Sequence, residues 1–352
     1  MNRNFQHGGQ VYDADGQIDF KLDFSANINP LGLSQKIKQA LIENIEGIVH
    51  YPDPSATELK SSLSKFYNVP RENLVLLNGA AEFFYLYCNV MKPARIIIPV
   101  PSFLEYERAA RSINTDVEYF YLREENNFQL NVEKLFDKVT VEKFDCLIIG
   151  RPNNPTGNLI SIDDIKKLST AVNILVDESF IDFLPIESAR KIVDEKICVV
   201  QSLTKIFAIP GLRLGFAVVE KNFAEKLEAS KDVWNVNFLA QKAGVAALAD
   251  EKFLHDTRTW LEDEKNYFTR RLKELFDVKV FEPIVNFVLI KFPTKEIANN
   301  LVKKLRDKKI LVRSCGNFVG LDEKFLRLAI RTRAENNILL SAMSEIKFSK
   351  NF

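Results

Sequence analysis

The chain has 352 residues, 46% hydrophobic and 27% charged, which is enough for one sizeable α/β domain and a smaller second domain. Its 48 basic and 47 acidic residues nearly cancel, which argues against a nucleic-acid-binding surface or an acidic tail. No run approaches the roughly 18 apolar residues of a membrane-spanning helix. The polar start (residues 1–9) has no apolar signal region. Four widely spaced cysteines without a CxxC pair predict a reducing cytoplasm, with no disulfide framework and no metal site.

The first 45 residues form an arm that is rich in Pro and Asn around residues 27–31, with a helix predicted over residues 34–46. We expect this arm to join a small domain. Beyond it, short apolar runs alternate with amphipathic ones. Strands are predicted at residues 74–77, 95–100, 117–122, 145–150, 174–177, 198–202 and 215–219, with helices at residues 80–91, 103–112 and 161–171. Strands that are apolar along their whole length are covered on both faces, so this alternation predicts a mostly parallel sheet in a three-layer sandwich.

After about residue 260 the pattern changes to that of a smaller α+β domain. Helices are predicted at residues 263–275, 295–307 and 334–346, and strands at residues 278–281, 286–292, 310–315 and 325–331. The sequence therefore predicts a large domain over residues 46–260, and a small domain made of residues 1–45 and 261–352.

The most informative stretch runs from Ser202 to Gly215, where hydroxyl and apolar side chains surround Lys205 and Arg213 follows eight positions later. A lysine that reacts with the aldehyde of pyridoxal phosphate must be partly desolvated, so that its neutral amine is accessible near neutral pH. The apolar neighbours Ile206 and Phe207 supply that environment, and Arg213 could hold the cofactor phosphate. Taken alone, Lys205 could equally be a surface lysine in a loop.

Polar, small or aromatic residues follow four of the predicted strands. Asp177 ends one strand, where a carboxylate can keep a pyridine nitrogen protonated, although it could also cap a helix. Asn154 lies in an Asn-Pro-Thr-Gly turn and could bond the phenolic oxygen of the cofactor. Ala80 and Ala81 open a helix whose N–H groups suit a phosphate, and Phe103 could stack on a flat ring. Each feature has a structural alternative, but their recurrence at successive strand ends favours one shared site.

This order and spacing resembles the fold-type I pyridoxal phosphate enzymes, in particular their histidinol-phosphate aminotransferase-like branch. Within that branch it is most similar to the enzymes that decarboxylate L-threonine O-3-phosphate in cobalamin biosynthesis. The resemblance covers nearly the whole chain and rests on residues 7–9, 23–32, 51–54, 103–106, 202–215, 234–237, 313–318 and 326–333. It implies an α/β fold, the three-layer α/β/α fold of the aspartate aminotransferase type, with a smaller α+β domain.

The resemblance also implies roles for matching positions. Lys205 would bond pyridoxal 5′-phosphate covalently and Asp177 would pair with its pyridine nitrogen. Asn154 would bond the ring oxygen and Phe103 would stack on the ring. The remaining cofactor contacts, all to the phosphate, would come from Ala80, Ala81, Ser202, Thr204, Arg213 and, across a subunit boundary, Tyr51. The residues that would hold the phosphate and carboxylate of the substrate are His7, Asn29, Arg313 and Arg327.

A role for Tyr51 at the neighbouring subunit's cofactor implies a homodimer with shared active sites. Two positions depart from the family pattern. The related aminotransferases usually carry a tyrosine three residues after the pyridine-pairing aspartate, whereas this chain has Phe180. Loss of that hydroxyl should alter the electronics of the bound cofactor, which weakens the aminotransferase interpretation. Gln10 stands where an asparagine is expected after the His-Gly-Gly segment.

We therefore interpret the chain as a pyridoxal phosphate-dependent carboxy-lyase that converts L-threonine O-3-phosphate to (R)-1-amino-2-propanol O-phosphate. Serine phosphate remains an alternative substrate, because a missing methylene gives only ~1–3 kcal/mol of discrimination. The main alternative is a histidinol-phosphate or related amino-acid aminotransferase. A non-catalytic module of the same fold is a third interpretation, against which the complete set of cofactor residues argues. We expect neither a nucleic-acid nor a membrane partner.

Overall fold

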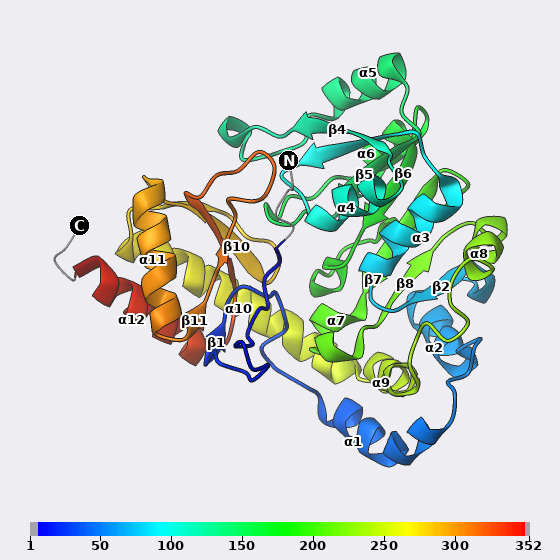
Figure 1. The fold of residues 1–352 in the computed structure, drawn as a ribbon, viewed down its shortest axis with the longest axis horizontal. Helices are drawn as coiled ribbons and strands as arrows, with labels where there is room; N and C mark the ends of the chain where they lie inside the picture. The colour runs from blue at the N-terminus through cyan, green and yellow to red at the C-terminus, as the bar shows by residue number, and fades with distance from the viewer. Residues whose placement is uncertain (1–5, 349–352) are drawn as a thin grey trace.

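A computed structural model of the chain describes residues 6–348; residues 1–5 and 349–352, which the predicted small domain includes, lie outside the described residues. Its centre is a seven-stranded sheet, the large sheet, in the order β2-β8-β7-β6-β5-β3-β4 (Figure 1). In chain order the strands are β2 (Leu74–Leu77), β3 (Arg95–Val100), β4 (Asp116–Tyr121), β5 (Cys146–Gly150), β6 (Asn173–Asp177), β7 (Ile197–Ser202) and β8 (Gly215–Val218). In this sheet β8 alone runs antiparallel to its neighbours. The predicted mostly parallel sheet is confirmed.

Helices cover both faces of the large sheet because successive side chains of a strand point to opposite faces. Cys146 and Ile148 of β5 pack on the face that holds α3 and α4, whereas Leu147 and Ile149 pack on the face that holds α5 and α6. The helices of these layers are α3 (Ala81–Met91), α4 (Leu104–Ser112), α5 (Val132–Glu142), α6 (Ile162–Ser169) and α8 (Lys221–Glu228). The predicted three-layer α/β/α sandwich is therefore confirmed.

A second, antiparallel sheet, the small sheet, has the order β12-β13-β10-β9. Its elements and flanking helices are β9 (Lys279–Phe281), β10 (Phe287–Lys291), α11 (Lys295–Asp307), β12 (Arg313–Ser314), β13 (Phe325–Ala329) and α12 (Arg333–Phe348). The N-terminal arm, which we define as residues 6–34, lies against this part of the fold. Its strand β1 (Leu22–Asp23) pairs in parallel with β11 (Ile310–Leu311).

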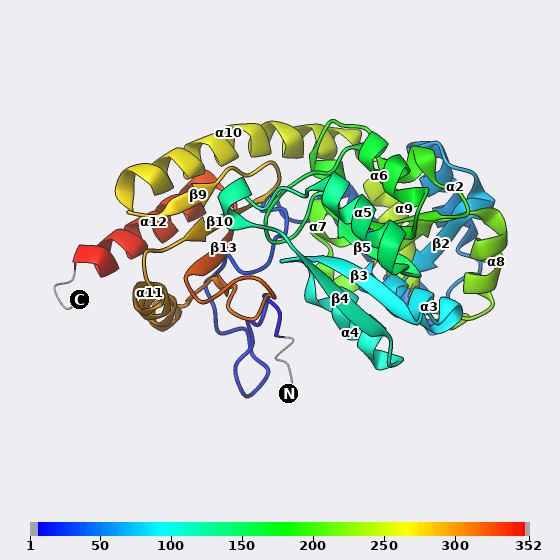
Figure 2. The same cartoon turned by 90° about the horizontal axis from the view of Figure 1, so that it is seen from above.

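The helix α10 (Glu251–Leu275) is continuous over 25 residues and runs along both sheets (Figure 2). The predicted helix at residues 263–275 missed its first turns, although Asp250 caps them and Leu254, Thr257 and Leu261 continue one buried stripe. The predicted domain boundary at residue 260 falls inside this helix. Since α1 (Gln35–Asn44) also packs against α9 (Phe238–Leu248), the division into two domains stays a prediction.

The remaining elements are short or lie at the rim of the large sheet. They are η1 (Ile45–Val49), α2 (Thr57–Tyr67), η2 (Arg71–Asn73), η3 (Glu124–Asn126), η4 (Ile181–Phe183), η5 (Ala189–Ile192), α7 (Leu203–Ile206) and η6 (Pro210–Leu212). All four cysteines are buried and unpaired. Among residues 6–348, no helix combines the length and the apolar character that crossing a membrane requires.

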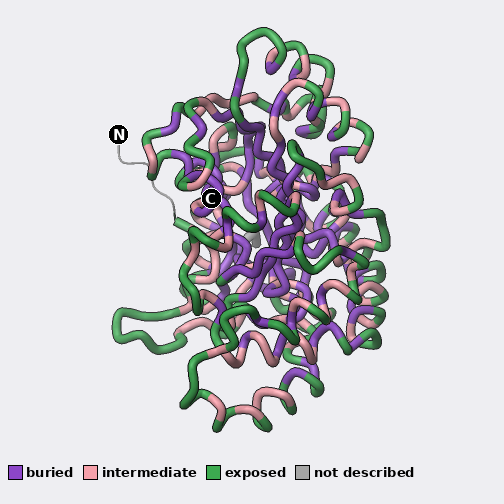
Figure 3. Tube along the Cα trace, turned by 90° about the vertical axis from the view of Figure 1, so that its right-hand side faces the viewer, coloured by how far each residue is buried: buried purple, intermediate pink, exposed green. Residues whose placement is uncertain are grey.

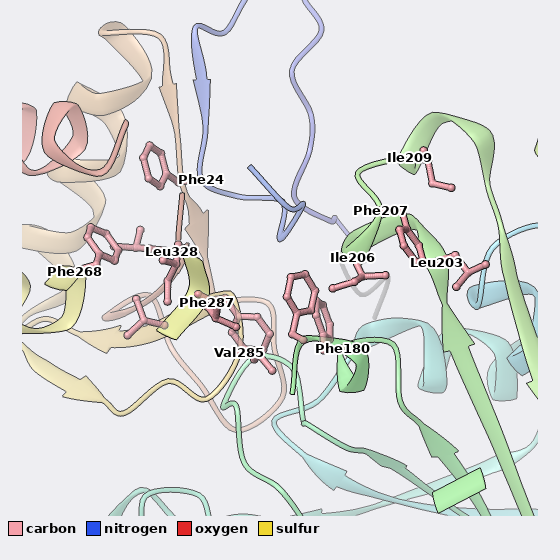
Figure 4. Close-up of a cluster of buried hydrophobic side chains, with 14 of the residues drawn as sticks. Phe24, Phe180, Leu203, Ile206, Phe207, Ile209, Phe268, Val285, Phe287 and Leu328 are labelled. Carbon is pink, nitrogen blue, oxygen red and sulfur yellow. The ribbon is translucent and has the colours of Figure 1, made fainter. Parts of the chain in front are cut away.

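One hydrophobic cluster connects the two sheets, within the buried interior that Figure 3 shows in purple. Phe180 lies between Phe287 of β10 and Ile206 of α7 (Figure 4). The rings of Phe180 and Phe287 meet almost edge-on, with centroids 5.1 Å apart. Phe268 of α10 and Leu328 of β13 continue the cluster on the side of the small sheet. The packing that stabilises the small sheet therefore also supports α7.

We expect Phe268→Ala to lower the free energy of unfolding by about 3–5 kcal/mol, because Phe268 is fully buried and its removal leaves a cavity in the cluster, on the side of the small sheet. Urea denaturation followed by circular dichroism measures this loss. Phe268→Leu keeps most of the side-chain volume and serves as the control, with a clearly smaller loss. Equal stability of Phe268→Ala and the unchanged protein would contradict this account of the cluster.

Candidate active site

A cavity of about 450 Å³ lies at the carboxyl edge of the large sheet and is closed on one side by the small sheet and the N-terminal arm. Asp177 ends β6, Ser202 ends β7, and Lys205 follows in α7. These side chains converge because neighbouring parallel strands end at one edge of a sheet. The predicted site residues in the cavity wall are His7, Ala80, Ala81, Phe103, Asn154, Asp177, Ser202, Thr204, Lys205, Arg213, Arg313 and Arg327.

Lys205 presents its amine to this cavity from the short helix α7. Its Nζ donates a hydrogen bond to Ser202 Oγ at 3.0 Å and lies 5.6 Å from the centre of the Phe180 ring. Burial lowers the pKa of Lys205 from 10.5 to about 8, although the Asp177 carboxylate opposes this shift. A substantial fraction of the amine is therefore neutral, and able to react with an aldehyde, slightly above neutral pH.

Asp177 is fixed by two hydrogen bonds in the buried floor of the cavity. Its Oδ2 accepts from the hydroxyl of Tyr106 at 2.7 Å, and its Oδ1 accepts from the backbone N–H of Ser179 at 2.9 Å. Burial, together with the Asp177 carboxylate, raises the pKa of Tyr106 well above its ordinary value, so this hydroxyl stays a donor. The sequence offered one signal for Tyr106, its place one helical turn after Phe103.

A cradle for a phosphate lies at the start of α3. Ala80 and Ala81 line the cavity there, and Gly79 precedes them with a left-handed φ of 81°. A Cβ on Gly79 would lie 2.3 Å from Nη2 of Arg213, so only glycine permits this approach of the guanidinium. Ser202 Oγ and Thr204 Oγ1, 2.7 Å apart, complete the group. Backbone N–H groups at a helix start, a guanidinium and hydroxyls together suit a phosphate.

Arg327 enters the cavity from β13 and is buried. Its Nη1 donates to Asn154 Oδ1 at 2.6 Å and its Nη2 donates to the Ser25 carbonyl, whereas its buried Nε has no partner. Burial lowers the pKa of Arg327 to about 10. The amide nitrogen of Asn154 makes no hydrogen bond within residues 6–348, so it is available to a cofactor oxygen, and the predicted contact with that oxygen stays a prediction.

Arg313 enters from β12 and is held by oxygen atoms that carry no full charge. Its Nη1 donates to the Ser314 carbonyl at 2.6 Å, and its Nη2 donates to the Gln6 carbonyl at 2.8 Å and to Asn317 Oδ1 at 2.7 Å. Burial lowers the pKa of Arg313. Within the described residues neither Arg313 nor Arg327 forms an ion pair with a carboxylate. Because an uncompensated buried charge is costly, both guanidinium groups point to an anionic ligand.

The N-terminal arm and α4 supply the last part of the wall. The rings of His7 and Phe103 lie 5.5 Å apart, and the Phe103 ring also meets Tyr106 edge-on. His7 Nε2 lies 2.6 Å from Oε1 of Glu105, a residue for which the sequence predicted no role. His7 and Phe103 are thus brought to the predicted site.

Asn29 requires a correction, because it does not line the cavity. Its amide nitrogen donates to the Ile206 carbonyl at 2.8 Å and to the Thr257 hydroxyl at 2.7 Å, and its backbone N–H donates to the Lys205 carbonyl at 3.0 Å. These contacts occupy the side chain that was predicted to bind substrate. Asn29 instead fastens the arm to α7 and α10, which positions the helix that carries Lys205.

Tyr51 also lies outside the cavity of its own chain. Its side chain is 77% exposed, and its ring stacks on Trp234 with centroids 4.3 Å apart. An exposed tyrosine of this kind is available to a second subunit, so its predicted contact with a neighbouring cofactor stays a prediction.

The chain resembles known proteins over nearly its whole length. The family described as aminotransferase class I and II matches residues 20–343. The threonine-phosphate decarboxylase of Salmonella typhimurium is 36% identical over 97% of both chains. An adenosylcobalamin biosynthesis bifunctional protein of Leptospira interrogans is 33% identical over 97% of this chain and 41% of that protein. The histidinol-phosphate aminotransferase structure from Clostridium acetobutylicum superposes with a TM-score of 0.86 and 32% identity, covering 93% of this chain and 99% of the other.

We expect Lys205 in the cofactor-free protein to be acetylated with a midpoint near pH 8, because only the neutral amine reacts and burial lowers its pKa. Competitive labelling with acetic anhydride, followed by mass spectrometry of the Lys205 peptide, measures this midpoint. Asp177→Asn removes the carboxylate that opposes the shift, so the midpoint should move to lower pH. A midpoint near 10.5 in the unaltered protein would show that Lys205 is solvated.

Proposed function

The chain belongs to the aminotransferase class I and II family, and we propose that within this family it decarboxylates L-threonine O-3-phosphate to (R)-1-amino-2-propanol O-phosphate, for cobalamin biosynthesis. The observation that carries the proposal is the pair of buried guanidinium groups, Arg313 and Arg327, that no carboxylate of the described residues neutralises. A substrate with both a phosphate and a carboxylate supplies one anion to each. The planar fork of arginine suits both groups.

The cofactor of the family is pyridoxal 5′-phosphate, and the cavity residues fit it. Lys205 offers an amine of lowered pKa to the aldehyde, and the buried Asp177 carboxylate suits the pyridine nitrogen. The free amide nitrogen of Asn154 can donate to the ring oxygen. The phosphate fits the cradle between Gly79 and Arg213, where a Cβ would remove the space. When bound, pyridoxal phosphate accepts the electrons of the bond that breaks at the α-carbon of the substrate.

The two arginines contact different parts of the cavity wall. Nη1 of Arg327 donates to Oδ1 of Asn154, a proposed cofactor contact, at 2.6 Å, whereas Nη2 of Arg313 donates to the carbonyl of Gln6, next to His7, at 2.8 Å. We therefore assign the substrate carboxylate to Arg327 and the phosphate to Arg313 and His7. Binding energy from the remote phosphate then orients the carboxylate, so that the bond to CO2 is the one that breaks. Lys205, with a pKa of about 8, is suited to return a proton to the α-carbon.

Transamination of histidinol phosphate is the second candidate, and the similarity to the aminotransferase from Clostridium acetobutylicum favours it. Both reactions use the same cofactor, but transamination breaks the bond to hydrogen instead. Histidinol phosphate also carries a phosphate without a carboxylate, so it supplies an anion to only one of the two arginines. Phe180 favours decarboxylation, since related aminotransferases have a hydroxyl at this position. In this chain the ring packs against Phe287 and offers no donor to the cofactor.

We further propose that the active form is a homodimer in which Tyr51 contacts the cofactor phosphate of the second subunit. Tyr51 is exposed and lies outside its own cavity. Its neighbours along the chain and around Trp234 include further exposed apolar side chains, namely Ile42, Ile45, Ile48, Val49 and Val233. Apolar side chains exposed together in this number are typical of a surface that another chain covers.

We expect the purified holoenzyme to release CO2 from threonine phosphate without any keto acid, and free threonine to be a poor substrate because it leaves Arg313 without an anion. Labelled CO2 release measures the reaction. Lys205→Ala serves as the control and should lose both activity and the visible absorption of the lysine-bound cofactor. Conversion of histidinol phosphate that depends on 2-oxoglutarate, with no CO2 from threonine or serine phosphate, would establish the aminotransferase instead.

Mixed dimers test the shared site. Lys205→Ala and Tyr51→Phe homodimers should each be impaired, whereas a heterodimer of the two contains one site with an intact Lys205 and the intact Tyr51 of the other chain. Activity should therefore reappear on mixing by co-expression. If Tyr51 served its own chain, the heterodimer would have no intact site and no activity would be recovered.

A further inference from the structure

We propose that Glu105, which has no part in the cofactor contacts above, positions His7 to bind the substrate phosphate and thereby sets the preference for phosphorylated amino acids. The inference rests on the proposed function. Glu105 lies in the first turn of α4 and in the cavity wall, yet it is only 7% exposed. A buried carboxylate beside a proposed anion site needs a physical reason, because its charge opposes that of the ligand.

Three side chains donate to Glu105 and satisfy both of its oxygens. His7 Nε2 lies 2.6 Å from Oε1, the hydroxyl of Tyr85 lies 2.6 Å from Oε2, and Nη1 of Arg108 lies 3.3 Å from Oε1. Burial alone would raise the pKa of Glu105, but the hydrogen bonds from His7 and Tyr85 and the nearby charges lower it to about 2. Glu105 is therefore an ionised acceptor at every pH at which the enzyme would work.

The ionised state of Glu105 decides which atom donates in its contact with His7. A carboxylate can only accept, so the hydrogen between the two groups belongs to Nε2 of His7. The ring makes no other hydrogen bond within the described residues, which leaves its second nitrogen, Nδ1, for a ligand. Because phosphate oxygens also accept, Nδ1 binds a phosphate only when it carries a hydrogen too, so the ring that bridges Glu105 and the phosphate is the imidazolium.

The backbone of His7 is held independently from the other side of the cavity. Gly8 lies so close to Ser25 that a Cβ would come within 2.1 Å of the Ser25 carbonyl oxygen. The carbonyl of Gln6 accepts from Nη2 of Arg313 at 2.8 Å. His7 and Arg313 therefore belong to one end of the cavity, and the contact with α4 orients the imidazole there.

The charges around this contact lead to a distinctive expectation. Among the described residues, the charged and titratable groups that contact Glu105 besides His7 are Tyr85 and Arg108. Arg313 is connected to the pair through the carbonyl of Gln6, the residue before His7. With His7 present, Glu105 assists phosphate binding because it fixes the imidazole between itself and the ligand. With His7 removed, the same carboxylate faces the phosphate directly and repels it. Glu105 should thus favour binding in one background and oppose it in the other.

The test uses O-phosphoethanolamine, which carries the amine and the phosphate but has no carboxylate to lose, titrated into the holoenzyme by calorimetry. Glu105→Gln should weaken its binding by about tenfold or more, as expected for loss of a charge-assisted contact. In a His7→Ala background, Glu105→Gln should instead strengthen binding. A residue that merely stabilises the fold would weaken binding in both backgrounds, so the reversal of sign identifies positioning through His7.

Glu107→Gln is the matched control, because Glu107 is a buried carboxylate on the same helix that bonds Arg111 Nε at 2.7 Å and the Tyr119 hydroxyl at 2.6 Å, outside the cavity. It should leave binding unchanged. If Glu105→Gln does not yield folded holoenzyme, Glu105→Asp replaces it, since it keeps the charge and draws the carboxylate away from His7. It should weaken binding in the presence of His7 and give no gain without it.

The role of Glu105 is overturned if Glu105→Gln weakens O-phosphoethanolamine binding both with and without His7. It is also overturned if Glu105→Gln leaves binding unchanged when His7 is present. The reaction itself is tested separately by CO2 release from threonine phosphate. If the effect of Glu105→Gln reverses sign but no CO2 is released, the proposed anion site stands and the proposed reaction is wrong. If CO2 is released but Glu105→Gln binds O-phosphoethanolamine as tightly as the unaltered protein, the proposed reaction stands and the proposed role of Glu105 is wrong.

Discussion

The site depends on positive charge that is held out of water and that forms no ion pair with a carboxylate among residues 6–348. Arg313 and Arg327 are buried, yet the groups that receive their hydrogen bonds are carbonyl and amide oxygens. Such oxygens accept hydrogen bonds from the Nη groups but carry no full charge, and Nε of Arg327 has no partner among the described residues. An anionic ligand bound between these two arginines would complete interactions that the protein alone leaves open, and it would stabilise the arrangement of the sheets that carry them.

The lysine at the centre of the site is positioned by segments far apart in the sequence. Asn29 of the N-terminal arm bonds the carbonyls of Lys205 and Ile206 and the hydroxyl of Thr257 in α10. A helix as short as α7 has little stability of its own, so these bonds and the core beneath it define where the amine lies. The arm thus contributes to both ends of the cavity. Asn29 positions the helix that carries Lys205, and His7 lies at the end where Arg313 enters.

The strands and their polar ends could be predicted from the sequence because buried parallel strands leave continuous apolar runs, and the residue after each run lies at a known edge of the sheet. Asp177, Asn154 and Lys205 follow from this rule. Glu105 and Glu107 do not, because both are acidic residues in one amphipathic helix. Only the packed fold shows that the first faces the cavity and the second faces away from it. The substrate-binding role predicted for Asn29 was wrong for a related reason. A motif can place a residue near a site, but it does not show which way the side chain points.

The proposed cofactor contacts come from the ends of the large sheet, whereas the proposed substrate contacts come from the arm and the small sheet. Phe180 lies where these two parts meet. Its ring packs against Phe287 of β10 and lies 5.6 Å from Nζ of Lys205. The strand β10 in turn pairs with β13, with Leu289 opposite Arg327. A tyrosine at this position would place a hydroxyl between Lys205 and the small sheet, whose strand β13 carries Arg327. Phe180 therefore lies between the proposed cofactor contacts and the proposed substrate contacts, where a change of side chain would reach both.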